Sequence, residues 1–334
     1  EDGVKPYLKL YPTSGYGNQE LIRNLVDREN PDAIMIYTDP RFWAWLFQME
    51  HELRMHLPIL YYNIWDDLPY PMWNQPYYDS VDALFNISKQ TVNIVKNVRS
   101  SHKPWQVTYI PHGINEEVFY PIDEKHVEYP KVENFKKKFK KDTEFIVFFN
   151  NRNIRRKLPG DIILAFKSFC DKLPKEEADK CALLMHTTPV DKNGTDLPAV
   201  KAAVAPECNI YFSDKRVDQK EMNLMYNMCD ITLNMASNEG FGLGTAESLM
   251  CGKPMIVNVT GGLQDQCGFK YKDKHLTVDD YDWVHSLHDR NKWMDNPDLT
   301  YGEWVKPIWP NNRSLQGSPP TPYIFDDRCG FEDA

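Results

Sequence analysis

Short apolar segments of strand length alternate with longer segments of helical pattern along most of the chain. This alternation is typical of a parallel sheet that is covered by helices. The first part is therefore expected to form an α/β unit. It has predicted strands at 33–37, 58–62, 82–86 and 106–110, and predicted helices near 18–29, 41–56 and 89–98.

The same alternation restarts at residue 145 and predicts a second doubly wound sheet. Ligands of such sheets bind beyond the carboxyl ends of the strands, so the residues that follow each strand are examined for chemistry. After about residue 270 the pattern becomes unclear. The second unit has predicted strands at 145–149, 182–186, 209–212, 231–235 and 254–257, and predicted helices at 160–172, 197–204, 219–229 and 245–251.

A break rich in proline separates the two units. It runs from Pro111 through Pro121 and Pro130 to the lysine-rich stretch 136–141, which we interpret as the solvated face of a short helix. An anionic membrane surface is the other interpretation of these lysines. We predict two domains, residues 1–118 and 119–334, which agrees with a length of 334 residues.

Composition and charge narrow the function classes. The net charge of −9 argues against general nucleic-acid binding, which needs an excess of Lys and Arg on one surface. No apolar stretch approaches the roughly 18 residues that cross a bilayer. The seven cysteines are scattered without a C-x-x-C pair, so the sequence predicts no zinc site, no disulfide framework and a cytoplasmic location.

The segment 238–247, NEGFGLGTAE, follows a predicted strand and opens a predicted helix. Its alternate glycines allow close approach of a ligand to the backbone, and amides at a helix N-terminus favour a phosphate. Because carboxylates repel phosphates, we expect Glu247 to bind ribose hydroxyls and Glu239 to bind a sugar. The pattern therefore suits a nucleotide sugar, and a strand-to-helix turn without a ligand is the alternative.

Glu239 and Glu247 form an E-x7-E pattern, which SLMCGKP at 248–254 and the pair Gly261-Gly262 follow. This combination resembles the signature of retaining glycosyltransferases of family 4, or glycosyl transferases group 1. The resemblance implies the GT-B fold, an α/β fold with two facing Rossmann-like doubly wound parallel-sheet domains, the first incomplete. A dehydrogenase is the weaker alternative, because its phosphate loop reads G-x-G-x-x-G rather than G-x-G-x-G.

A basic segment, NNRNIRRK at 150–157, follows the first strand of the second unit. It is similar to the R-x4-K loop of the family, whose Arg and Lys bind the donor diphosphate, and the match falls on Arg152 and Lys157. Two cations placed there stabilise the charge on a departing diphosphate without a metal. Arg155 and Arg156 are alternatives, and an exposed basic turn is the interpretation without a ligand.

Three weaker resemblances concern single residues. His112, in the interdomain segment IPHGI, is expected to be a hinge residue. His186 and Ser213 each lie where the family gathers around the nucleobase, although His186 equally fits a core position. Asp66 stands where many members carry a histidine and is expected to contact the transferred sugar or the acceptor; a turn with Asx-type hydrogen bonds is the alternative.

The resemblance therefore implies a complete set of site residues, without a metal or a cofactor. The catalytic residues are Glu239, Arg152, Lys157 and Asp66, and the donor-binding residues are Arg152, Lys157, His186, Ser213, Gly240, Phe241, Gly242, Leu243 and Glu247.

The implied reaction transfers a hexosyl or related sugar, with retention of configuration, from a nucleoside diphosphate sugar to an acceptor hydroxyl. The acceptor is a carbohydrate, a lipid-linked molecule or a protein, and peripheral membrane contact is a further interpretation. A nucleotide-sugar epimerase and a non-catalytic nucleotide-sugar-binding protein remain alternatives. The family pattern also leads us to expect a chain truncated at both ends, because its usual first strand and closing helix are not evident.

Overall fold

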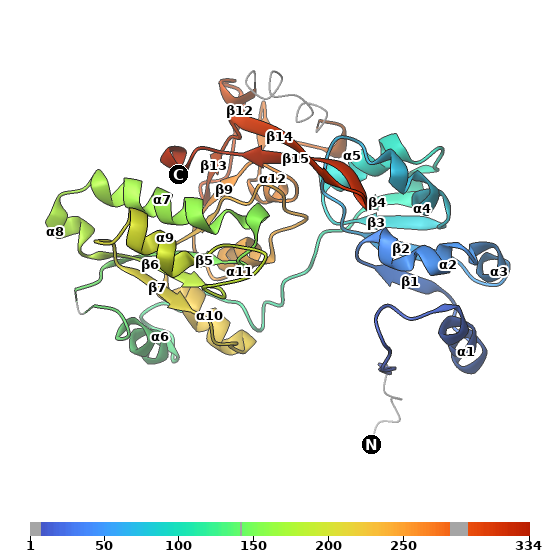
Figure 1. Ribbon diagram of the computed structural model, residues 1–334, viewed down its shortest axis with the longest axis horizontal. Helices are drawn as coiled ribbons and strands as arrows, with labels where there is room; N and C mark the ends of the chain where they lie inside the picture. Colours follow the sequence, from blue (N-terminus) through green and yellow to red (C-terminus); the bar gives the residue numbers. More distant parts are fainter. Residues whose placement is uncertain (1–7, 141, 281–292) are drawn as a thin grey trace.

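The computed structural model describes residues 8–140, 142–280 and 293–334. Two α/β units lie side by side, and the segment that joins them passes between them (Figure 1). Each unit contains a parallel sheet whose strands run between helices. This arrangement confirms the α/β class expected from the alternating pattern.

The first sheet has the order β1-β2-β3-β4, with every neighbouring pair parallel. All four predicted strands are confirmed. Strand β2 lies inside the sheet, and Ile59 and Tyr61 on it are fully buried. The strands and confirmed helices are β1 (Ile34–Tyr37), β2 (Ile59–Asn63), β3 (Ala83–Asn86), β4 (Val107–Tyr109), α1 (Gln19–Glu29) and α5 (Lys89–Val98).

The continuous helix predicted at 41–56 is wrong. The segment forms three short pieces because the backbone leaves helical geometry at Trp43 and at Met49. Leu46 and Phe47 on the second piece and Leu53 on the third are buried in the core. The pieces, with the other short elements of this unit, are η1 (Pro40–Trp43), α2 (Ala44–Phe47), α3 (Glu50–Arg54), η2 (Met72–Asn74), α4 (Gln75–Asp79) and η3 (Pro104–Gln106).

The second sheet has the order β13-β9-β8-β5-β6-β7 and is parallel throughout. The chain runs from β5 to one edge and then returns to β8, so the winding direction reverses between β5 and β8. Doubly wound sheets bind ligands beside such a reversal. The strands are β5 (Phe145–Asn150), β6 (Cys181–His186), β7 (Ile210–Ser213), β8 (Ile231–Asn234), β9 (Met255–Asn258) and β13 (Val305–Ile308).

The predicted helices of the second unit are confirmed with shifts of one or two residues at their ends. The segment predicted as a linker contains a further helix, α6, whose Val132 packs in one buried cluster with Leu224 of α10. The lysines that follow α6 are largely exposed, as a solvated face requires. The elements are α6 (Tyr129–Lys136), η4 (Arg155–Lys157), α7 (Pro159–Asp171), α8 (Lys175–Ala178), α9 (Leu197–Val204), α10 (Gln219–Met228), α11 (Leu243–Met250) and α12 (Leu263–Gln266).

The pattern makes no prediction after residue 270, where the structure forms a small antiparallel sheet and a long hairpin, β14–β15. The hairpin extends from the second unit to the first (Figure 1). The amide of Phe325 donates to the carbonyl of Leu68 at 2.6 Å, and the Tyr323 hydroxyl donates to the carbonyl of Tyr70 at 3.2 Å. The elements are β10 (Lys270–Tyr271), β11 (Lys274–His275), β12 (Leu299–Thr300), β14 (Asn312–Ser318), β15 (Thr321–Arg328) and η6 (Phe331–Asp333).

The first sheet lies within residues 1–118 and the second within 119–334. The boundary between residues 118 and 119 stays a prediction. The two units also meet near α5 and α12, where Gln264 Nε2 donates to Gln90 Oε1 at 2.8 Å. Of the helices in the described part of the chain, none has the length and apolarity that crossing a membrane requires.

Candidate active site

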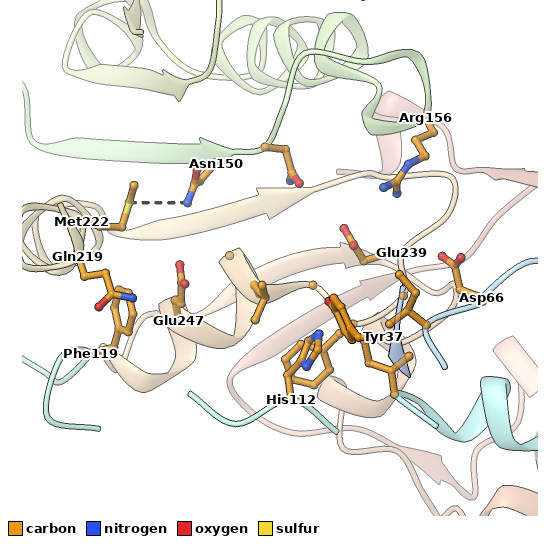
Figure 2. A pocket seen from close by; sticks show the side chains of 18 of the residues that line it. Tyr37, Asp66, His112, Phe119, Asn150, Arg156, Gln219, Met222, Glu239 and Glu247 are labelled. Atoms are coloured by element: carbon orange, nitrogen blue, oxygen red, sulfur yellow. Dashed lines mark hydrogen bonds between the residues drawn. The ribbon is translucent and has the colours of Figure 1, made fainter. Parts of the chain in front are cut away.

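A cavity of about 580 Å³ opens between the two units, beyond the carboxyl ends of β5 and β8. Figure 2 shows Arg156, Glu239 and Asp66 at one end of this cavity and Glu247 at the other. We call it the main pocket. Its lining includes seven residues of the predicted site together with other residues from both units. The predicted lining residues are Asp66, Glu239, Gly240, Phe241, Gly242, Leu243 and Glu247, and the added ones include Tyr37, His112, Asn150, Arg156 and Gln219.

The glycines of the predicted loop are required by its close packing. Gly242 has φ +89°, and a Cβ there would lie 2.6 Å from the Leu263 side chain. A Cβ on Gly261, which has φ +48°, would lie 2.0 Å from the carbonyl oxygen of Glu239. The amide of Gly262 donates to that same carbonyl at 2.8 Å. The Gly-Gly pair after β9 therefore supports the backbone that carries Glu239.

Glu247 lies on α11 and is held by a chain of hydrogen bonds. The Tyr226 hydroxyl donates to Glu247 Oε2 at 2.7 Å, and Asn150 Nδ2 donates to the Tyr226 oxygen at 2.7 Å. Burial raises the pKa of Glu247, while the Tyr226 hydrogen bond acts in the opposite direction. One carboxylate oxygen is thus fixed by protein, and the side chain borders the main pocket. Sequence reasoning missed Tyr226, which is fully buried on α10.

The carboxylate of Glu239 forms an ion pair with the ammonium of Lys157. Their side chains are 12% and 7% exposed, so both are largely removed from water. Burial lowers the pKa of Lys157, and the charge of Glu239 opposes this shift. Beside this pair, Arg156 Nη1 donates to the carbonyl of Asn238 at 2.7 Å and lines the main pocket.

Asp66 follows β2 and brings a carboxyl group from the first unit to this end of the main pocket. Burial raises the pKa of Asp66 to about 6; the positive charge of Arg156 opposes the shift and the negative charge of Glu239 adds to it. Burial also raises the pKa of the adjacent Asp67, which accepts a hydrogen bond from Asn238 Nδ2 at 2.5 Å. Asp66 thus lines the main pocket, and its expected contact with the transferred sugar or the acceptor stays a prediction.

Four predicted site residues do not line the main pocket: Lys157, which lies behind it in the ion pair with Glu239, and Arg152, His186 and Ser213. The Arg152 side chain is 63% exposed, and its Nε lies 3.5 Å from Asp191 Oδ2. His186 Nδ1 and Ser213 Oγ are 3.0 Å apart at the ends of β6 and β7, and burial lowers the pKa of His186. Ser213 lines a neighbouring cavity of about 440 Å³. The roles predicted for Arg152, His186 and Ser213 stay predictions.

His112 was interpreted as a hinge residue, yet it lines the main pocket. Its Nδ1 lies 3.0 Å from the Tyr62 hydroxyl, and its ring meets Phe241 edge to face at 5.2 Å. Burial lowers the pKa of His112. In doubly wound sheets, residues that follow the strand ends approach the ligand. Applying this rule to β4, as to the second sheet, would have identified His112.

One family model and several solved structures match the chain. The family model described as "Glycosyl transferases group 1" matches residues 130–301. No curated protein matches the chain. Several solved structures do, at identities that show the fold alone.

Alr3699/HepE from Anabaena, solved in complex with UDP and glucose, is 14% identical with a TM-score of 0.58, over 77% of this chain and 68% of that chain. Sucrose-phosphate synthase (tll1590) from Thermosynechococcus elongatus is 18% identical with a TM-score of 0.55, over 74% of this chain and 61% of that chain. The α,α-trehalose 6-phosphate synthase of Burkholderia multivorans is 11% identical with a TM-score of 0.55, over 83% of this chain and 67% of that chain. These likenesses confirm the expected GT-B fold.

Proposed function

The chain belongs to the glycosyl transferases group 1 family, whose model matches more than half of it, and we propose that it transfers a sugar from a nucleoside diphosphate sugar to an acceptor hydroxyl. The observation that carries the proposal is that Glu239 and Glu247 lie at opposite ends of the main pocket (Figure 2). Residues 240–244, which we call the glycine loop, line the pocket between them. Solved structures of Alr3699/HepE with UDP and glucose, and with UDP-glucose, support a nucleotide-sugar donor.

In this proposal each end of the main pocket binds a different part of the donor. Glu247, fixed by Tyr226, accepts hydrogen bonds from the ribose, and Glu239 accepts them from the sugar. The diphosphate then lies along the glycine loop, where the backbone amides at the start of α11 face an anion. Arg156 and Lys157 stand at the sugar end, where the bond to the leaving group breaks.

The proposed step exchanges one glycosidic bond for another. The bond from the anomeric carbon to the diphosphate oxygen breaks, and a bond from that carbon to the acceptor oxygen forms on the same face. The acceptor proton passes to the departing diphosphate, so no enzymic nucleophile is assigned. Positive charge from Arg156 and Lys157 stabilises the leaving group, and we therefore propose that the step proceeds without a metal ion.

A panel assay tests the proposal and separates it from the two alternatives. The chain is incubated with UDP-, GDP- and ADP-sugars, and nucleotide release, sugar isomerisation and binding are measured in parallel. Transfer is expected to appear as release of a nucleoside diphosphate that rises when acceptors are added. Isomerised donor without release identifies an epimerase, and binding without turnover identifies a non-catalytic protein. Retention of configuration, a hexosyl donor and a cytoplasmic location stay parts of the proposal.

A further inference from the structure

A second cavity, of about 380 Å³, adjoins the main pocket. The two cavities share Ile64, Asp66 and Arg156 as lining residues, so they meet where the donor sugar is proposed to lie. The β14–β15 hairpin forms one side of the second cavity, which we call the hairpin pocket. No part of the proposed donor site accounts for this space.

The hairpin side of this cavity is fixed to the first unit. Arg41 Nη1 donates to the carbonyl of Pro320 at 2.9 Å and to Thr321 Oγ1 at 2.6 Å. The same guanidinium forms an ion pair with Asp39. On the hairpin's other strand, Gln316 borders the cavity and its Oε1 lies 3.4 Å from Arg155 Nη1. A ligand in the hairpin pocket would therefore contact both units at once.

Charge at the hairpin pocket favours hydroxyl groups over phosphate. Its described lining includes four carboxyl groups and three guanidinium groups. The cations are already engaged: Arg41 pairs with Asp39, and Arg156 bonds to the Asn238 carbonyl and faces Asp66. Arg155 lies 3.7 Å from Asp326.

A phosphate entering this space would have to compete with these carboxyl and carbonyl partners for the three guanidinium groups, which disfavours its binding. Carboxylate, amide and hydroxyl side chains instead match the paired donor and acceptor of a sugar hydroxyl. The polar members of the lining that suit such contacts are Asp67, Asn238, Gln316, Ser318 and Thr321, and the apolar ones are Ile64, Trp65 and Ile324.

We propose that the hairpin pocket is the acceptor subsite, that it binds an uncharged saccharide, and that the β14–β15 hairpin decides which acceptors enter. This inference rests on the proposed transferase function. Asp66, which borders both cavities, is placed to contact the acceptor hydroxyl beside the donor sugar.

Two tryptophan substitutions on the same strand test this assignment. Gln316→Trp fills the hairpin pocket, whereas Leu315→Trp is the matched control, because Leu315 is 63% exposed and does not line the cavity. A third variant, Ser318→Trp, blocks the pocket from the hairpin turn should Gln316→Trp fail to fold. The donor is the nucleotide sugar that the chain hydrolyses fastest without acceptor, and the acceptor probes are glucose, maltose, sucrose and glucose 6-phosphate.

Neutral saccharides are expected to stimulate nucleotide release more than glucose 6-phosphate does. Gln316→Trp should raise KM for the saccharide by about tenfold or more, equivalent to about 1.4 kcal/mol, while donor hydrolysis in water and nucleoside diphosphate affinity stay near those of Leu315→Trp. The acceptor assignment would be overturned if KM for the saccharide stayed unchanged in both pocket variants, or if these variants lost donor binding as much as saccharide binding. It would also be overturned if only glucose 6-phosphate, or none of the four probes, stimulated nucleotide release. Absence of donor hydrolysis and of diphosphate binding in the wild type would instead refute the proposed function.

Discussion

The ammonium of Lys157 donates a hydrogen bond to the carboxylate of Glu239, although 82 positions separate the two residues in the chain. Lys157 follows β5 and Glu239 follows β8, and these neighbouring strands flank the reversal of the second sheet. The fold thus brings together the two sequence motifs that were identified independently. Because both charges are largely buried, each depends on the other for compensation.

This dependence predicts a non-additive effect on stability. Lys157→Met leaves a buried carboxylate without its cation, and Glu239→Gln leaves a buried ammonium without its anion. Each single variant should lower the free energy of unfolding by about 3 kcal/mol, whereas the double variant should lose clearly less than the sum. Urea denaturation of all four proteins measures the coupling. Additive losses would show that the two charges are not coupled in the folded state.

The raised pKa of Asp66 predicts a pH-dependent stability. Its ordinary pKa of 3.8 rises to about 6 in the folded state, so folding favours the protonated carboxyl. The stability that this proton contributes is fully present below about pH 4 and is lost as pH rises through 6. Asp66→Asn keeps a neutral side chain, and should gain up to about 3 kcal/mol over the wild type between pH 4 and pH 7.

Urea denaturation at several pH values measures this difference between wild type and Asp66→Asn. The exposed Asp32 provides the control, because Asp32→Asn should leave the pH profile of the wild type unchanged. A wild-type profile that runs parallel to that of Asp66→Asn would mean that Asp66 is solvated like an ordinary surface carboxylate.

Two arginines of one loop are expected to differ in their effect on turnover. Arg156 lines the main pocket, whereas Arg152 is turned to solvent near Asp191. Arg156→Ala should therefore reduce kcat by about a hundredfold, as for other preorganised charges that stabilise a transition state. Arg152→Ala should have a much smaller effect. Steady-state kinetics with saturating donor measure kcat for both variants. A larger loss of kcat in Arg152→Ala would indicate that Arg152, the arginine of the R-x4-K pattern, stabilises the diphosphate.

Much of the second unit could be predicted because its strands are continuous apolar runs, of which Phe145–Asn150 is the clearest. The side-chain directions in the loop 151–157, which follows this strand, could not be predicted. They depend on the short turn η4 and on Leu158, whose φ of 48° is rare for a residue with a branched side chain. Arg152 and Arg156 are the same residue type, so only this backbone path separates the exposed cation from the one in the pocket.

The hairpin could not be predicted for a different reason. Strands Asn312–Ser318 and Thr321–Arg328 carry polar residues on both faces for much of their length, so they lack the alternation that marks a half-buried strand. Their stability comes from contacts with distant segments, such as the bond between Phe325 and Leu68. The hairpin pocket could not be predicted either, because its lining combines residues from distant parts of the chain: 39–67, 155–156, 238 and 316–326.

Metal independence gives a simple prediction. Because Arg156 and Lys157 already place positive charge at the leaving-group end, EDTA should change turnover by less than about twofold. The assay uses metal-free buffers, and a parallel sample with added Mg²⁺ serves as the comparison. Strong loss of turnover in EDTA that Mg²⁺ restores would refute the assignment of charge balance to these two side chains.

Substitutions of Glu247 and Glu239 are expected to affect ligand binding differently, because the two glutamates lie at opposite ends of the main pocket (Figure 2). Glu247→Gln should weaken binding of both the free nucleoside diphosphate and the intact donor, since the ribose is present in each. The loss should be about 1.5 to 3 kcal/mol for both ligands, the usual worth of a hydrogen bond to a charged group. Tyr226→Phe, which frees the Glu247 carboxylate from its hydroxyl partner, should reproduce a smaller part of this loss.

Glu239→Gln should leave the affinity for nucleoside diphosphate nearly unchanged, because only the sugar meets that carboxylate. Its effect should instead appear in kcat and in the preference for the sugar donor over the bare diphosphate. Calorimetric titration of each variant with both ligands measures the difference, after circular dichroism has shown that the variant is folded despite the unpaired Lys157. Equal losses for diphosphate and donor in Glu239→Gln would contradict the assignment of this end of the main pocket to the sugar.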